Sequence, residues 1–120
     1  MIQAFKIYEK LPSLNEYINL CRRNKYQANK FKTDIEKRIR NYIYCGQLVP
    51  VKKCRIEFHW IEPDKRRDLD NIISAKKFIL DSLQEAKIIQ TDGQRHVCEI
   101  RDFVRIDKGV EEVRVIIEEV

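Results

Sequence analysis

Alternating apolar and polar residues mark four short stretches of the chain. They cover residues 1–9, 54–60, 97–106 and 113–120, and Asp107, Lys108 and Gly109 separate the last two. A period of two is typical of strands that bury one face, and an Asp-Lys-Gly sequence is typical of a turn. The pattern therefore predicts four strands, with a turn between the last two.

Two longer segments repeat apolar residues at steps of three and four, which is typical of amphipathic helices. The first runs from about residue 24 to residue 44, and Gly46 predicts its end. The second opens with Asp68-Leu69-Asp70-Asn71 and reaches about Glu85. Asp and Asn favour a helix start because their side chains cap free amides and the helix dipole attracts anions there. Leu11-Pro12-Ser13-Leu14-Asn15 predicts a break after the first strand.

These elements follow the order strand, helix, strand, helix, strand, strand. The economical architecture is an α/β fold in which a mixed sheet packs against two main helices. The 120 residues suffice for one modest core, and no repeat or linker is visible. We expect a single domain over residues 1–120. No apolar run approaches the ~20 residues of a membrane span, and no signal-peptide pattern is present at the start.

Four cysteines are spread along the chain without a Cys-x-x-Cys pair. Reduced, inert thiols and a cytoplasmic location are the expectation. A zinc site would need Cys54, His59, His96 and Cys98, but their spacings are not those of known zinc ligands.

The formal net charge is +5, and the basic residues are concentrated in two blocks. One block lies between Arg22 and Arg40 and includes Lys30 and Lys37 on the outer face of the first helix; the other is Lys65-Arg66-Arg67. Several cations on one face are what a polyanionic nucleic acid requires. A merely solvated basic helix remains an alternative for the first block.

Acidic residues adjoin the second basic block. Asp68 and Asp70 are two residues apart near a helix start, and Asp92 follows that helix. Two or three carboxylates suffice for Mg²⁺, which prefers oxygen ligands and keeps several waters. Bound Mg²⁺ activates water and offsets charge on a scissile phosphate. From the residues alone, a phosphodiester enzyme and a purely structural helix cap and turn both remain open.

The segments Arg55-Ile56-Glu57-Phe58-His59 and Asp64-Lys65-Arg66-Arg67-Asp68-Leu69-Asp70-Asn71 closely resemble RusA-type Holliday junction resolvases. The resemblance continues through Lys77-Phe78-Ile79-Leu80-Asp81-Ser82-Leu83 and Asp92-Gly93-Gln94, and Leu11-Pro12-Ser13 with Asn15 is similar to an early segment of that family. It implies a RusA-like homodimeric α/β crossover junction endodeoxyribonuclease that depends on Mg²⁺, with Mn²⁺ possible. Such an enzyme binds four-way DNA junctions and resolves them by paired symmetric nicks in recombination and repair.

The resemblance also implies roles for particular residues. Asp68, Asp70 and Asp92 match the metal-binding acids of the family. The essential lysine matches Lys77, with Lys76 in reserve, because this helix carries extra residues before it. Lys77 lies about two helical turns from Asp70 and therefore projects from nearly the same face.

The residues expected to bind DNA are Lys65, Arg66 and Arg67 beside the cut and Lys30 and Lys37 along the duplex arms. We interpret Asn71 as a cap, Trp60 as a core or dimer contact, and His59 and His96 as structural. The alternatives are a non-catalytic protein that binds junctions, a nuclease for other branched nucleic acids, and a small interaction domain without activity. The family is common in phages and prophages, so a role there is expected.

Overall fold

A computed structural model describes all 120 residues. The elements are β1 (Ile2–Ile7), α1 (Leu14–Arg23), α2 (Lys25–Cys45), β2 (Cys54–Glu62), α3 (Leu69–Ile73), α4 (Lys76–Glu85), β3 (Val97–Ile106) and β4 (Glu112–Glu119). The four strands form one sheet in the order β1-β4-β2-β3. β2 and β3 are parallel, whereas β4 is antiparallel to both β1 and β2. The predicted α/β class and mixed sheet are confirmed.

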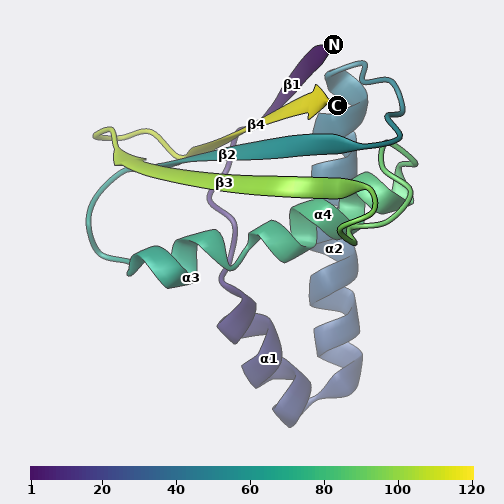
Figure 1. Cartoon of the computed structure of the whole chain (residues 1–120). Coiled ribbons are helices and arrows are strands. Elements are labelled where there is room, and N and C mark those ends of the chain that lie inside the picture. Colours follow the sequence, from purple (N-terminus) through teal and green to yellow (C-terminus); the bar gives the residue numbers. More distant parts are fainter.

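All four helices lie on one side of the sheet, so the other face of the sheet is open (Figure 1). Inward residues alternate along the strands, as the period of two requires. They pack with the apolar stripes of α2 and α4 into one core. Its largest fully buried side chains include Trp60, Phe58, Phe78, Ile39 and Leu83. None of the helices combines the length and the apolar character needed to cross a membrane.

Helix α1 was not predicted from the sequence. It begins after Ser13, whose hydroxyl oxygen accepts a hydrogen bond from the Glu16 amide at 3.3 Å. No residue of α1 is fully buried. Tyr17 nevertheless packs edge-on against Phe78, with ring centroids 6.0 Å apart. The Ser-x-x-Glu spacing is the sequence signal that could have revealed this helix.

The second predicted helix is two helices. α3 ends at Ile73 and α4 begins at Lys76, and the two lie end to end with a break between them (Figure 1). The hydroxyl of Ser74 donates to the Asn71 carbonyl at 2.8 Å and accepts from the Leu14 amide at 3.0 Å. A serine that bonds to the backbone in this way competes with the helical ladder and bends the helix. The predicted continuous helix is therefore wrong at residues 74–75.

Gly46 follows α2 as predicted, but for a packing reason. Its φ of −75° is ordinary, and Gln47 is the residue that takes the left-handed conformation, with φ 53°. A Cβ atom at position 46 would lie 2.9 Å from the Cβ of Phe5. The glycine therefore allows the end of α2 to approach β1 closely.

Candidate functional site

The first two predicted acidic residues lie at the start of α3, on the surface. Asp68 is the N-cap residue in extended conformation (φ −69°, ψ 151°), but its side chain makes no capping hydrogen bond. Asp70 lies in the first turn. Both residues are exposed, and neither carboxylate forms an ion pair or a side-chain hydrogen bond. Both carboxylates are therefore available to a cation, and capping does not account for them.

The third predicted acid, Asp92, is brought next to the predicted lysine. Lys77 lies in the first turn of α4, and its Nζ is 2.9 Å from Oδ2 of Asp92 and 3.1 Å from Oδ1 of Asp81. The hydrogen bond to Asp92, followed by that to Asp81, raises the pKa of Lys77. The side chain therefore stays a cation over the whole physiological range, as a group that stabilises phosphate charge must.

The three predicted aspartates do not form one group. No three or more His, Cys, Asp or Glu side chains lie close enough together to hold a metal ion. In Figure 1, α3 lies at one end of the α3–α4 segment, and the loop between α4 and β3 lies toward the other. The break at Ser74 also removes the continuous helix from which a shared face for Asp70 and Lys77 was predicted. The three-ligand Mg²⁺ set thus stays a prediction, and Asp92 is paired with Lys77 instead.

The reserve lysine, Lys76, points to a different partner. Its ammonium forms an ion pair with Oδ2 of Asp102 on β3. The other oxygen of Asp102 accepts a hydrogen bond from Nε1 of Trp60 at 2.9 Å. The Lys76 and Asp102 side chains are only 25% and 18% exposed. This network joins α4, β2 and β3, which is a structural role for Lys76.

Asp102 was not singled out from the sequence, although a signal was available. In Ile100-Arg101-Asp102-Phe103-Val104 the acid shares its side of the strand with Ile100 and Val104. An acid on the side that faces the helices needs a partner there, and the indole Nε1–H and the ammonium provide two.

The predicted cations of the second basic block differ in their availability. Lys65 is exposed and makes no ion pair. Arg66 is exposed and lies 3.5 Å from the carboxylate of Asp64. Arg67 turns inward: its Nη1 donates to the Leu11 carbonyl at 2.8 Å, and its Nε lies 3.3 Å from Oε1 of the buried Glu62. Lys65 and Arg66 are therefore placed to make the predicted phosphate contacts. Arg67 mainly anchors the segment between β2 and α3 to the core.

The outer face of α2 also divides into paired and free cations. Lys30 and Lys37 are exposed, make no ion pair and lie two turns apart, so they share one face. The other basic residues of the helix centre are neutralised: Lys32 by Asp81, Arg38 by Glu9 and Arg40 by Glu85. Lys30 and Lys37, together with the exposed Lys25 at the start of the helix, are thus the cations of α2 that are available to a polyanion.

The remaining singled-out residues have structural partners. The prediction that Asn71 caps the helix is wrong, because Asp68 occupies the N-cap position. The Oδ1 of Asn71 instead accepts a hydrogen bond from Asn15 Nδ2 at 3.2 Å, which links α3 to α1. Trp60 is buried in the core. His59 stacks on Phe103 with ring centroids 5.0 Å apart, and Nδ1 of His96 lies 2.8 Å from Thr91 Oγ1.

All four cysteines are free thiols. Cys54 is fully buried, and this burial raises the pKa of its thiol to about 11. It is therefore an unreactive thiol at neutral pH.

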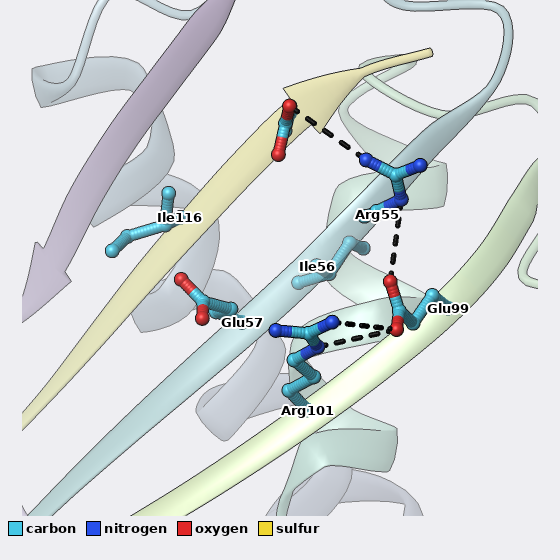
Figure 2. Close-up of a pocket in the computed structure, with 7 residues that line it drawn as sticks. Arg55, Ile56, Glu57, Glu99, Arg101 and Ile116 are labelled. Atoms are coloured by element: carbon cyan, nitrogen blue, oxygen red, sulfur yellow. Dashed lines mark hydrogen bonds and ion pairs between the residues drawn. The ribbon is translucent and has the colours of Figure 1, made fainter.

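A hollow of 170 Å³ lies on the open face of the sheet, and none of the predicted site residues lines it (Figure 2). Both of its arginines are already paired: Arg55 lies 3.2 Å from Glu99 and 3.7 Å from Glu118, and Arg101 lies 3.1 Å from Glu99. Because both arginines are neutralised, the hollow offers no free cation to a phosphate. The helix-covered side and the edge at β3 carry the candidate site instead.

In comparisons with known proteins, the chain matches neither a protein-family profile nor a curated protein sequence.

Proposed function

We propose that the protein is a metal-dependent endonuclease that binds four-way DNA junctions and resolves them by paired symmetric nicks in recombination and repair. One observation carries the proposal: Asp68 and Asp70 are exposed carboxylates without partners beside a connection rich in cations. Such carboxylates are open to a divalent cation. The neighbouring cations offset the repulsion between an acidic site and a polyanion. We propose the four-way junction as the substrate because the sequence motifs resemble those of RusA-type Holliday junction resolvases.

The two carboxylates at the start of α3, those of Asp68 and Asp70, fit a Mg²⁺ ion that is bound by few protein ligands. Mg²⁺ commonly takes one or two carboxylates and completes its shell with waters and substrate phosphate oxygens. Asp68 and Asp70 therefore suffice, whereas Asp92 would first have to leave Lys77. When bound, the metal ion would supply an activated water and offset phosphate charge. Mn²⁺ prefers the same oxygen ligands.

The remaining roles fall to side chains of the chain itself. Lys77 stabilises negative charge on the scissile phosphate, and Asp92 orients its ammonium. Lys65 and Arg66 hold the backbone beside the cut, where the planar guanidinium can grip two phosphate oxygens. Lys30 and Lys37 contact a duplex arm through phosphates, independently of base sequence.

Paired nicks also require two active sites. A junction of four arms has approximate two-fold symmetry, and a two-fold homodimer would present two sites related by the same axis. We therefore propose a homodimer. Sedimentation equilibrium tests it, because the dimer mass is twice the 14.5 kDa of one chain.

A second candidate function is binding of branched DNA without cleavage. The observation that favours it is the lack of a group of three or more potential metal ligands. Free cations such as Lys30, Lys37 and Lys65 would serve a binder as well as a nuclease. A nuclease for other branched nucleic acids differs from the main proposal only in substrate.

Cleavage of a labelled synthetic four-way junction distinguishes these functions. The assay compares Mg²⁺, Ca²⁺ and EDTA, with linear duplex and flap DNA as further substrates. Asp70→Asn should abolish nicking and preserve gel-shift binding. Glu111→Gln is the control, because Glu111 is also an exposed carboxylate without an ion pair and lies just before β4, away from α2 and α3 in the sequence. Tight junction binding without cleavage in Mg²⁺ or Mn²⁺ would favour the binder, and equal cutting of all substrates would remove the junction specificity.

A further inference from the structure

A groove of 370 Å³ lies between α3, with the connection before it, and the C-terminal end of β3. Its volume is within the range of about 300–1,000 Å³ that is common for small-molecule sites. Leu69, Ile72, Val104 and Ile106 form its apolar part. Leu69 and Ile106 are 63% and 42% exposed, although both are large apolar residues. Exposed apolar surface of this kind, bordered by charges, is typical of a binding site.

The rest of the groove lining is charged. It consists of Lys65, Arg67, Asp68 and Arg105. Lys65 and Arg105 make no ion pair, whereas Arg67 is paired with Glu62 at 3.3 Å. The groove therefore combines an apolar floor with two free cations and with one of the free carboxylates of the candidate site. Arg105 was not among the residues predicted from the sequence.

We propose that this groove binds one unstacked nucleotide of a DNA strand, with its base on the apolar floor and a flanking phosphate between Lys65 and Arg105. The proposal rests on the proposed nuclease function and specifies its substrate. A nucleotide joins a flat, largely apolar base to an anionic phosphate, which matches the two parts of the groove. Because Asp68 lines the same groove, that phosphate would lie beside the candidate cutting site.

Regular duplex DNA does not account for the apolar floor. In a duplex the bases are stacked inside, so a protein that contacts only the backbone meets sugars and phosphates. Leu69 and Ile106 would then stay exposed to water or touch charged groups. Bases at a branch point or in a single strand leave the stack at a lower cost. The groove therefore favours cutting at or next to a branch point, where an unpaired nucleotide can enter it.

The test is a binding experiment in EDTA, so that cleavage plays no part. Fluorescence anisotropy compares a labelled oligothymidylate with a tetrahydrofuran-phosphate chain that has the same number of phosphates but no bases. The wild type should bind the oligothymidylate about fivefold more tightly or better, because contact with a base adds to the phosphate contacts. Leu69→Ser should remove this preference, whereas Arg105→Ala should weaken binding of both chains.

Ile2→Ser is the matched control, because Ile2 is 67% exposed and lies on β1, at the opposite edge of the sheet from β3. Circular dichroism checks that each variant is folded, and Ile106→Ser provides a second groove variant. Equal binding of both chains by the wild type would overturn the groove proposal alone. Loss of preference in Ile2→Ser as large as in Leu69→Ser would also overturn it. Failure of the wild type to bind either chain would likewise overturn the groove proposal, and the gel shift on the four-way junction tests the proposed function separately.

Discussion

The Nζ atom of Lys77 lies 2.9 Å from Oδ2 of Asp92, which joins the first turn of α4 to the loop before β3. The next residue toward the N-terminus, Lys76, pairs with Asp102 on the strand itself. The two adjacent lysines thus have different surroundings: Lys77 is half exposed and paired with Asp92, whereas Lys76 is largely covered. This difference separates their expected roles in an experiment.

Replacement of Lys77 should affect activity much more than stability. Lys77→Met removes an exposed ion pair, which contributes about 0–1 kcal/mol to the free energy of unfolding. If Lys77 stabilises charge on the phosphate, the rate of junction cleavage should fall about 100-fold or more. Single-turnover cleavage and urea unfolding measure the two effects. Lys108→Met, at an exposed lysine without an ion pair, is the control and should change neither.

Replacement of Lys76 should have the opposite profile. Lys76→Met leaves the carboxylate of Asp102 without its cation in a partly buried position, so the free energy of unfolding should fall by about 1–3 kcal/mol. The double variant Lys76→Met/Asp102→Asn should recover part of this loss, because the uncompensated charge is gone. Urea unfolding of Lys76→Met, Asp102→Asn and the double variant, beside the wild type, gives the coupling. A Lys76→Met protein of unchanged stability that no longer cleaves DNA would instead identify Lys76 as the active-site lysine.

The fold was largely predictable because periodicity reports which residues are buried. The four strands and α2 match the predicted segments within about two residues, because each carries a clear period. The sheet order was not predictable, since β4 lies between β1 and β2 through contacts far apart in sequence. α1 was missed because it buries no residue completely, and the break at Ser74 depends on its contact with Leu14, which is remote in sequence.

The candidate site was predictable in its residue types but not in its pairings. The sequence identified the acids and the neighbouring cations, because their types and positions are visible along the chain. It could not show that Arg67 turns toward Leu11 and Glu62 while Arg66 stays outside. Nor could it show the groove, because Leu69 and Ile106 meet only in the folded chain.

The two neighbouring arginines should therefore separate stability from DNA binding. Arg67→Ala removes the hydrogen bond to the Leu11 carbonyl and leaves buried Glu62 without its cation, so unfolding should become easier by about 2–4 kcal/mol. Arg66→Ala removes an arginine whose side chain is 87% exposed, so stability should change by less than about 0.5 kcal/mol. The affinity of the Arg66→Ala protein for the junction should fall and should depend less steeply on salt concentration than that of the wild type. Thermal unfolding and titrations at several salt concentrations compare the two, and equal stability would refute the inward role of Arg67.

A buried acid on α2 makes stability depend on pH. Glu36 is 5% exposed, and its Oε2 has no hydrogen-bond partner. Burial raises the pKa of Glu36 to about 7; Lys32 opposes the shift, and Glu85 and Asp81 add to it. Arg40, one helical turn further along α2, is occupied by Glu85 and does not neutralise Glu36.

The sign of this pH dependence follows from the raised pKa. The folded state retains the proton of Glu36 between about pH 4.5, where the ordinary carboxyl titrates, and about pH 7. The resulting stabilisation is complete below the lower value and is lost as pH rises through the upper one. Glu36→Gln keeps the side chain neutral, so it should match the wild type near pH 4 and be more stable by about 1–3 kcal/mol near pH 8. Urea unfolding across this range measures the difference, with Glu16→Gln on the exposed side of α1 as control. A constant difference between Glu36→Gln and the wild type at every pH would show that Glu36 does not titrate in this window.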